Sequence, residues 1–452
     1  MRNTPFKEVA RRLGHESENS SPIASFQVDS RHIGPGDLFF ALPGDRTDGH
    51  CFLADVRERG GIGAVVSKSY GGPEFGLSLI RVDNVLAHLQ RLAKEEIQQS
   101  FMQIIGVTGT MGKTTTKDFI ATLLEAKYRV GKTYASYNTK LTLPITILNR
   151  QGDEEILVLE MGMGEPGDIG KLVEIAPPDM AVLTQVAMAH YGHFFPEGVR
   201  GVARAKAEIF SHPKTKKAIF FHGLAQFPEV IEATIPEKLT FSLDDRSADY
   251  FLSGNIIDER GVRAYCYPDF PFAERHIRHN FLAAVSVARA CKMEWDQING
   301  QIGKLRLPKM RFEVFEKEGI TFVNDAYNAN PESVKGALSS LPEPKNGGKR
   351  IAVLGTMVDL GPFSKALHEE VGRFAQRYVD HLLTLGDEAV FLSEAFAEAK
   401  KPVEHFPDQS SFTGLTVRLQ EIMRPGDVVL VKGSRGLAME RIFERLETCS
   451  CS

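Results

Sequence analysis

The residues best suited to chemistry form a glycine-rich stretch, Gly106-Val-Thr-Gly-Thr-Met-Gly-Lys-Thr-Thr-Thr116. Small residues leave backbone N–H groups free to surround phosphate oxygens, and a helix that begins directly after such a loop adds its dipole. We expect Lys113 to reach the outer phosphates of a nucleotide and the Thr114 hydroxyl to bind Mg²⁺. Val107 stands where the strict P-loop spacing has its first glycine. The stretch still predicts an ATP site rather than an ordinary glycine-rich turn. The guanine-specificity motif Asn-Lys-x-Asp does not occur in the sequence, which argues against a GTPase.

A carboxylate follows an apolar run later in the chain. Glu160 comes directly after residues 156–159, which read Ile-Leu-Val-Leu. Ligands bind at the carboxyl ends of buried parallel strands, and Mg²⁺ prefers oxygen ligands. Glu160 is therefore a candidate magnesium ligand, and the alternative is an exposed glutamate at the end of a strand.

A lysine interrupts the apolar side of a predicted helix at residues 199–210. The apolar stripe consists of Val199, Val202, Ala203, Ile209 and Phe210. Lys206 lies within this stripe, whereas Arg200, Arg204 and Glu208 face away from it. Such a lysine commonly extends its ammonium to solvent. Burial would instead lower its pKa and leave a neutral amine that can react with CO₂ or act as a base. His190 is a candidate partner at the metal, with a satisfied loop histidine as the alternative.

The elements that position these residues follow from periodicity and turn signals. The first 98 residues hold short strand-like runs at 25–28, 37–42, 64–66 and 79–82, then a helix at 86–100. Strands at 104–107, 156–159 and 180–183 and a helix at 114–125 alternate next, which implies βαβ units. A linker near residues 304–308 precedes a second alternating run. Its predicted strands are 350–354, 381–385 and 427–431, and its predicted helices are 364–376, 389–399 and one at the end of the chain.

We therefore predict an α/β protein of three domains. Residues 1–98 form the first, residues 99–307 a central P-loop ATPase domain with a mostly parallel sheet, and residues 308–452 a Rossmann-like domain. Two nucleotide-type folds in one chain predict a substrate cleft between domains.

Composition narrows the partners and the compartment. A net charge of −4 and a pI near 6.4 favour neither nucleic acid nor an anionic membrane as a partner. The five cysteines are too scattered for a disulfide framework, and the N-terminal residues lack the apolar core of a signal peptide. We expect a cytoplasmic, monomeric protein.

The combination of these motifs resembles the Mur ligase family, which assembles the peptide of the bacterial cell wall. The glycine-rich loop is similar to that family's ATP loop, including the missing first glycine. The resemblance implies that a carbamylated Lys206 joins the metal site and that Lys113, Lys206, His190 and Arg311 take part in catalysis. It implies Mg²⁺ ligands at Thr114, Glu160, His190 and Lys206. It implies nucleotide contacts from Gly109, Thr110, Gly112, Lys113, Thr114, Thr115, Asn138, His276, Asn280, Arg311, Asp325, Tyr327 and Asn328.

The terminal parts of the chain distinguish between members of the family. Asp29-Ser30-Arg31 and Asp48-Gly-His50 resemble the UDP-sugar-binding domain of two members, which add the third amino acid or D-alanyl-D-alanine. Asn324-Asp-Ala-Tyr-Asn-Ala-Asn-Pro331 is similar to the signature of the second of these members. The resemblance implies substrate contacts from Ser30, Arg31, Asn330, Lys432, Ser434 and Arg435. It implies UDP-N-acetylmuramoyl-tripeptide and D-alanyl-D-alanine as substrates, with ATP and Mg²⁺ and an acyl phosphate intermediate.

Several positions depart from the family pattern. The family's Asn-Asn-x-Ile-Gly-x-Pro reads Asn138-Thr-Lys-Leu-Thr-Leu-Pro144, and Gln185, Arg275 and Asp359 replace an asparagine, a glycine and a glutamate. The alternatives are the ligase for the third amino acid, a folylpolyglutamate-type ligase and a P-loop regulatory ATPase that forms no bond. The sequence favours the ligase that adds D-alanyl-D-alanine.

Overall fold

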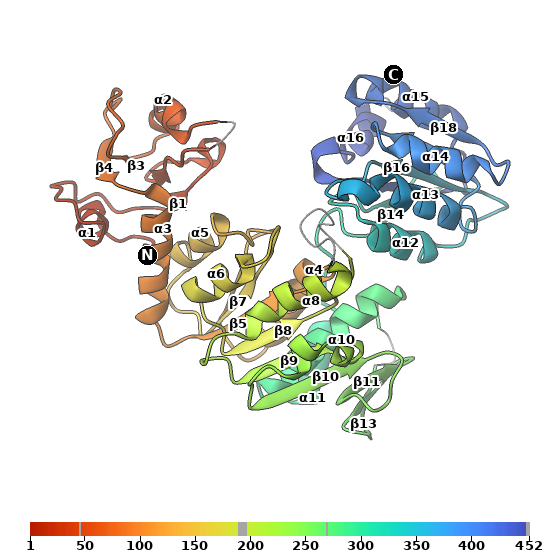
Figure 1. Cartoon of the computed structure of the whole chain (residues 1–452), viewed down its shortest axis with the longest axis horizontal. Coiled ribbons are helices and arrows are strands. Elements are labelled where there is room, and N and C mark those ends of the chain that lie inside the picture. The colour runs from red at the N-terminus through yellow and green to blue at the C-terminus, as the bar shows by residue number, and fades with distance from the viewer. Residues whose placement is uncertain (45–46, 189–196, 268–269, 449–452) are drawn as a thin grey trace.

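Three separate β-sheets organise the computed structural model, which describes residues 1–44, 47–188, 197–267 and 270–448. Each sheet belongs to its own lobe, and the chain passes through the three lobes in order (Figure 1). The N-terminal and C-terminal lobes both adjoin the central one and stand apart from each other. The predicted three-domain α/β architecture with a mostly parallel central sheet is confirmed.

The N-terminal lobe contains a four-stranded sheet in the order β1-β2-β3-β4, and all neighbouring strands are parallel. Its strands are short and its second strand is buried along its whole length, as expected for a parallel sheet covered on both faces. The elements of this lobe are α1 (Phe6–Arg12), β1 (Phe26–Gln27), β2 (Leu38–Phe40), α2 (Leu53–Glu58), β3 (Gly63–Ser67), β4 (Ser78–Val82) and α3 (Val85–Gln98).

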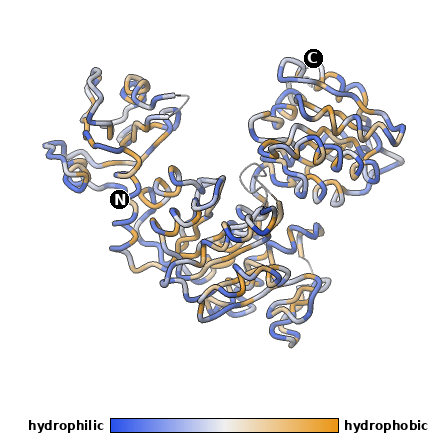
Figure 2. Tube along the Cα trace, in the orientation of Figure 1, coloured by the Kyte–Doolittle hydropathy of each residue, from blue (hydrophilic) through white to orange (hydrophobic). Residues whose placement is uncertain are grey.

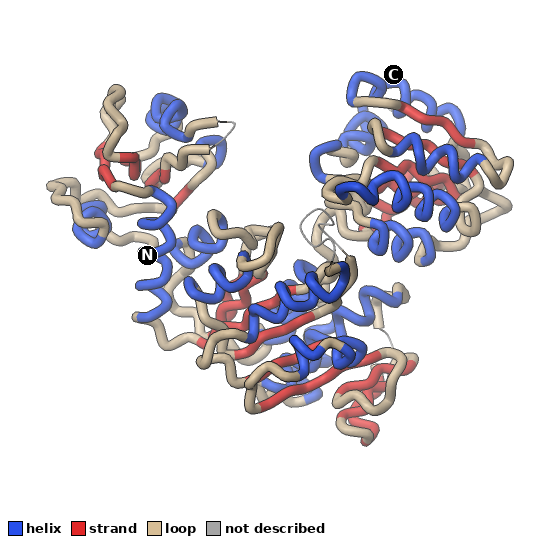
Figure 3. The backbone as a smooth tube through the Cα atoms, viewed as in Figure 1, coloured by secondary structure: helices blue, strands red, loops and turns tan. Residues whose placement is uncertain are grey.

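The central sheet has nine strands in the order β13-β12-β11-β10-β9-β8-β5-β7-β6. Strands β5 to β11 run parallel, and β12 and β13 complete one edge as an antiparallel hairpin (Figure 3). The strands are β5 (Gln103–Thr108), β6 (Val130–Lys132), β7 (Ile156–Glu160), β8 (Met180–Leu183), β9 (Lys217–Phe221), β10 (Glu237–Ser242), β11 (Tyr250–Ser253), β12 (Ile256–Glu259) and β13 (Val262–Cys266). The helices are α4 (Lys113–Leu124), α5 (Thr142–Leu148), α6 (Asp168–Ile175), α8 (Gly198–Ala207), α9 (Pro228–Ile231), α10 (Arg275–Ala290) and α11 (Trp295–Ile302).

Two apolar layers cover the faces of this sheet. Phe119 and Ile120 of α4 pack with Phe281 of α10 against one face. Residues of α5 and α6 lie over the other face, and α3 of the N-terminal lobe packs against both helices. The apolar residues run along the strands and the inner sides of the helices in Figure 2. The carboxyl ends of β5 and β7 therefore present their polar residues at one edge of a rigid layer.

The C-terminal lobe contains a six-stranded sheet in the order β14-β15-β19-β16-β17-β18, parallel except for β14. Its strands are β14 (Glu313–Lys317), β15 (Ile320–Asn324), β16 (Arg350–Gly355), β17 (His381–Leu385), β18 (Val403–Phe406) and β19 (Val428–Lys432). Its helices are α12 (Pro331–Ser339), α13 (Ser364–Ala375), α14 (Ala389–Ala397), α15 (Phe412–Ile422) and α16 (Arg441–Thr448). Within the described residues, no helix of any lobe has the length and apolar character needed to cross a membrane.

One predicted helix differs from the structure. The segment predicted as a helix at 199–210 is α-helical only to Ala207 and continues as a 3₁₀ turn at Glu208–Phe210. Val199, assigned to the apolar stripe, is exposed because it lies in the first turn of α8. Glu208 was predicted to face away from the apolar stripe, and its side chain is partly buried. Its carboxylate accepts hydrogen bonds from the backbone N–H groups of Gly167 and Gly170 at 2.8 and 2.9 Å. It thereby caps the start of α6.

Candidate active site

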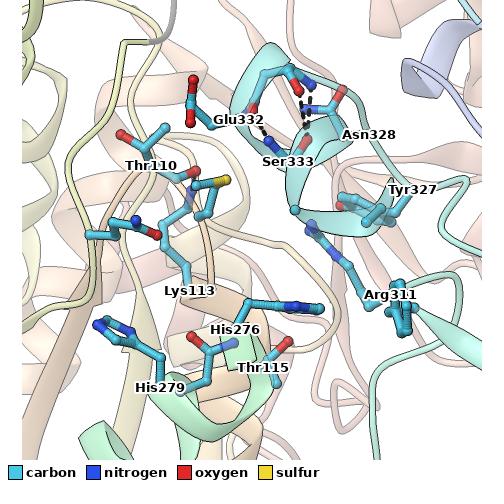
Figure 4. A pocket seen from close by; sticks show the side chains of 18 of the residues that line it. Thr110, Lys113, Thr115, His276, His279, Arg311, Tyr327, Asn328, Glu332 and Ser333 are labelled. Atoms are coloured by element: carbon cyan, nitrogen blue, oxygen red, sulfur yellow. Dashed lines mark hydrogen bonds between the residues drawn. The ribbon is translucent and has the colours of Figure 1, made fainter. Parts of the chain in front are cut away.

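A cavity of about 1030 Å³ lies between the central and C-terminal lobes. The loop between β5 and α4 forms one wall, α10 forms another, and the segments after β15 and before β14 close it from the C-terminal side (Figure 4). Most residues that the sequence assigns to the nucleotide meet here. The predicted residues in the wall are Thr110, Gly112, Lys113, Thr115, Asn138, Glu160, His276, Asn280, Arg311, Asp325, Tyr327, Asn328, Asn330 and Lys432.

Two glycines give the loop after β5 its shape. Gly112 has a φ of +80°, and a Cβ at this position would lie 2.2 Å from Asn280 Oδ1. Gly109 has a φ of +154°, and its Cβ would lie 1.9 Å from Thr184 Oγ1. Only glycine adopts this loop without strain and without collision. The neighbouring Thr110 N–H donates to the Gln185 carbonyl at 2.7 Å, which fixes the loop to the segment after β8.

Substituting alanine for Gly112 is expected to weaken nucleotide binding by about ten-fold or more, because the added methyl group displaces Asn280 and the left-handed backbone is strained. Isothermal titration with ADP checks this. Gly300→Ala is the matched control, since a Cβ at Gly300 meets nothing within 4 Å. Equal ADP affinity in the Gly112 variant and the control would show that the loop does not hold phosphate.

The first turn of α4 carries the cationic and hydroxyl groups. Lys113 is half-buried, and its ammonium donates to the carbonyls of Gly109 at 2.9 Å and Thr110 at 3.4 Å. Burial lowers the pKa of Lys113, Glu160 opposes that shift, and Arg311 adds to it. The Thr114 hydroxyl is buried below the wall and lies 3.3 Å from Ser136 Oγ. A cation folded back on its own loop is available to move onto a bound phosphate.

Glu160 has the environment of a metal ligand. It ends β7, it is 1% exposed, and its Oε1 accepts a hydrogen bond from Asn138 Nδ2 at 2.6 Å. Its other oxygen, Oε2, is buried and has no hydrogen-bond partner. An unpaired buried carboxylate oxygen is costly unless a cation binds it. Among the described residues, no group of three or more His, Cys, Asp or Glu side chains is placed to hold a metal ion.

Lys206 is buried, as the apolar stripe predicts. Its side chain on α8 is 3% exposed, and no salt-bridge partner is seen for it among the described residues. Burial first, and then the charge of Lys113, hold the pKa of Lys206 well below the ordinary lysine value. The alternative of a solvent-directed ammonium is excluded by this burial.

Arg311 joins the two lobes across the cavity. Its guanidinium lies 3.9 Å from the ring centroid of Tyr327, and its Nη2 donates to Thr114 Oγ1 at 3.4 Å. Both neighbours, Met310 and Phe312, have positive φ values of 59° and 55°. Left-handed backbone costs an ordinary residue about 1–2 kcal/mol and is concentrated at functional sites. The backbone is therefore strained where it presents Arg311 to the cavity.

Charged groups at the carboxyl ends of β15 and β19 complete the C-terminal wall. Lys432 Nζ donates to Asp325 Oδ2 at 2.6 Å and to the Asn328 carbonyl at 2.9 Å, while Asp325 Oδ1 accepts the Phe312 N–H at 3.1 Å. Burial lowers the pKa of Lys432 despite this carboxylate. His276 is T-stacked on Phe312 at 5.3 Å, and burial lowers its pKa as well. Asn330 also lines the cavity and caps α12 by accepting the Ser333 N–H at 2.8 Å.

Four predicted substrate residues lie outside the described wall of this cavity. Ser434 is buried between loops, where its hydroxyl donates to the Thr356 carbonyl at 2.7 Å and accepts the Val358 N–H at 3.1 Å. Arg435 pairs with Glu440 at 2.6 Å. Ser30 and Arg31 belong to the N-terminal lobe, where the side-chain hydrogen bond from Arg31 lowers the pKa of Asp29 to about 2. His190 lies outside the described residues.

Two basic residues of this region, His279 and Lys117, were not predicted from the sequence. Burial lowers the pKa of His279 to about 4; this side chain lines the cavity and lies edge-on to Phe221 and Phe241 at 4.7 and 5.0 Å. Lys117 is 1% exposed and lies one turn after Lys113. The sequence signal for the burial of Lys117 was the apolar run Phe119-Ile120-Ala121 that follows it, because a lysine beside an apolar run can be buried.

Comparison with known proteins places this geometry in a family. The model of the Mur ligase middle domain matches residues 107–288, and the model of the Mur ligase glutamate ligase domain matches residues 310–435. UDP-N-acetylmuramoyl-tripeptide--D-alanyl-D-alanine ligase of Bacillus subtilis is 31% identical over 96% of this chain and 95% of its own length. The protein of the same name from Escherichia coli K12 is 30% identical over 93% of each chain.

Solved structures agree with the sequence relatives. The MurF structure from Acinetobacter baumannii has a TM-score of 0.79 and 25% sequence identity, and the match covers 98% of both chains. MurF ligase from Thermotoga maritima in complex with ADP has a TM-score of 0.73 at 29% identity, over 94% of this chain and 97% of that one. The similarity thus extends across all three lobes.

Proposed function

We propose that this chain, which belongs to the Mur ligase family, is the ligase that joins D-alanyl-D-alanine to UDP-N-acetylmuramoyl-tripeptide with ATP and Mg²⁺. The observation that carries the proposal is the similarity to relatives of that name along almost the entire chain. The two family models alone would not distinguish its members, because they leave out the N-terminal lobe. The segment from Asn324 to Pro331, typical of this member, also contributes residues to the cavity wall.

The three lobes divide the substrates in this proposal. Residues 1–98 hold the UDP-sugar through Ser30 and Arg31, residues 99–307 hold ATP, and residues 308–452 close over it and bind the incoming amine. The predicted substrate contacts of Ser434 and Arg435 belong to this C-terminal lobe and stay a prediction. A cytoplasmic, monomeric enzyme of peptidoglycan precursor synthesis fits this assignment.

The cavity supports phosphoryl transfer from ATP to the terminal carboxylate of the tripeptide. This reaction depends on positioning and on neutralising the charge of the transferred group, rather than on a covalent enzyme nucleophile. Lys113 moves from its loop carbonyls onto the outer phosphates, and Arg311 approaches from the C-terminal lobe. Glu160, Thr114 and a carbamylated Lys206 would hold Mg²⁺, which neutralises phosphate charge when it is bound.

Amide formation follows in the same closed cavity. The amine of D-alanyl-D-alanine attacks the acyl carbon, forms the C–N bond and releases a proton and inorganic phosphate. Cations near the reacting carbonyl stabilise the tetrahedral oxyanion. Closure of the C-terminal lobe through the Arg311 contact excludes water, which would otherwise hydrolyse the acyl phosphate.

The choice of amine tests the assignment within the family. With UDP-N-acetylmuramoyl-tripeptide as acceptor, D-alanyl-D-alanine is expected to have a kcat/KM at least about a hundred-fold above that of D-alanine, lysine or diaminopimelate. A site built for a dipeptide leaves its own polar groups unpaired around a single amino acid. Steady-state kinetics of ADP formation with each amine provide the measurement. Preference for diaminopimelate or lysine, with the muramoyl-dipeptide as acceptor, would assign the chain to the third-residue ligase.

A further inference from the structure

We propose that Lys117 is a positioning residue of this site, which fastens residues 133–138 to α4 so that this segment orients Glu160. Residues 133–138 form a strap beside α4. The inference rests on the proposed function, because it takes Glu160 as the ligand of Mg²⁺. It adds a residue that neither the phosphate loop nor the metal-binding set includes.

The contacts of Lys117 are unusual for a lysine. Its side chain is 1% exposed, and its ammonium donates to the carbonyls of Thr133 and Ala135, each at 2.8 Å. The Asp118 carboxylate lies 3.5 Å away. The ammonium group of a lysine ordinarily remains in water. A buried ammonium is tolerated only where hydrogen-bond acceptors surround its N–H groups. Here two of the acceptors are backbone atoms of one short segment, and the ammonium links that segment to α4.

The strap in turn fixes Glu160 at two points. Thr133 Oγ1 accepts the Glu160 backbone N–H at 2.9 Å, and Asn138 Nδ2 donates to Glu160 Oε1 at 2.6 Å. The Asn138 carbonyl accepts the Gly162 N–H at 2.8 Å, which ties the strap to the residues after β7. Glu160 Oε2 is the oxygen that remains buried and unpaired. The strap therefore determines which carboxylate oxygen is available to a metal.

The backbone of the strap requires such fastening. Ala135 has a φ of +44°, a conformation that L-residues rarely adopt and that persists only when the surroundings enforce it. The adjacent Ser136 hydroxyl lies 3.3 Å from Thr114 Oγ1. Lys117 lies on the same helix as Lys113 and Thr114, so its ammonium sets the spacing between the phosphate-binding turn and Glu160. Groups that orient a metal ligand affect metal affinity without touching the metal.

The experiment compares the effect of Mg²⁺ on ADP binding in Lys117→Met and in the unaltered protein. Isothermal titration gives the Kd of ADP with and without Mg²⁺, well below the melting temperature of both proteins. We expect the Mg²⁺-dependent gain in ADP affinity to fall about ten-fold in the variant, as for other groups that orient metal ligands. The Mg²⁺-free Kd should change little, because Lys117 does not line the cavity among the described residues.

Two further variants make the result specific. Asn138→Ala should reduce the Mg²⁺-dependent gain similarly, and the double variant should lose little more, because both residues act through Glu160. Lys127→Met is the control, since Lys127 follows the same helix and its ammonium donates to the Lys292 carbonyl at 2.8 Å on the surface. Its Mg²⁺-dependent gain should be unchanged. If Lys117→Met does not fold, Lys117→Gln takes its place, because glutamine can retain one carbonyl contact. The Mg²⁺-dependent gain in ADP affinity should then fall by less than about ten-fold.

Three outcomes would overturn the inference. An unchanged Mg²⁺-dependent gain in Lys117→Met, with only a lower melting temperature, would make Lys117 a structural residue. Weaker ADP binding without Mg²⁺ would make it a direct phosphate ligand. No effect of Mg²⁺ on ADP binding in the unaltered protein would remove the proposed metal site itself, and the role of Lys117 with it.

Discussion

Lys206→Ala is expected to reduce ligation on the order of 10²-fold or more while the protein remains folded. An unmodified ammonium at this position would be costly, because the side chain is 3% exposed on α8. The lowered pKa of Lys206 favours the neutral amine, whose lone pair can attack the carbon of CO₂ and release a proton. The resulting carbamate is an anion and an oxygen donor suited to Mg²⁺.

Two observations check the modification itself. The protein equilibrated with ¹³C-bicarbonate should show one carbamate resonance in its NMR spectrum, and this resonance should be absent from Lys206→Ala. A short carboxylate such as acetate is expected to restore part of the lost activity by filling the space of the carbamate. Arg204→Ala is the control, because Arg204 lies on the same helix and its exposed side chain pairs with Glu197. A fully active Lys206→Ala would refute the carbamate.

The second large effect is expected for Lys113→Ala. Lys113 is the cation proposed to contact the transferred phosphoryl group, and losing such a group typically lowers the rate by on the order of 10²–10³. The main change should be in kcat, measured as ADP formation with saturating substrates. Lys216→Ala, which alters an exposed lysine whose ammonium bonds the Pro213 carbonyl, should leave kcat unchanged. Near-normal turnover in Lys113→Ala would exclude the assigned phosphate site.

Strands with clear boundary signals could be predicted from the sequence. The observed β8 and β17 have the predicted bounds, 180–183 and 381–385, because each is a mainly apolar run that directly follows an aspartate. By contrast, β9 to β13 and the long helix α10 were not predicted. The outer strand β13 is exposed along much of its length, so it lacks the apolar pattern that marks a core strand. Helix α10 begins with Arg275, His276 and Arg278, so its first turn does not show the apolar pattern of a buried helix.

Many residues of the cavity wall could be predicted from the sequence, but their arrangement could not. Glycine spacing identified the phosphate loop, and helical periodicity predicted the burial of Lys206. Periodicity gives the angular position of a side chain but not how far the neighbouring elements extend, and Val199 is exposed for this reason. The approach of Arg311 to Thr114 joins positions 197 residues apart, which local patterns do not contain. Lys117 was missed because most helical lysines are solvated.

In the proposed function, ATP cleavage by this protein is coupled to formation of one specific amide bond. The most direct test incubates the protein with ATP, Mg²⁺, UDP-N-acetylmuramoyl-tripeptide and D-alanyl-D-alanine, then measures ADP and identifies the UDP-linked product by mass spectrometry. We predict one UDP-N-acetylmuramoyl-pentapeptide for each ADP, with little ADP when either the tripeptide or the amine is left out. ADP formation at the same rate without either substrate, and no pentapeptide product, would contradict the account.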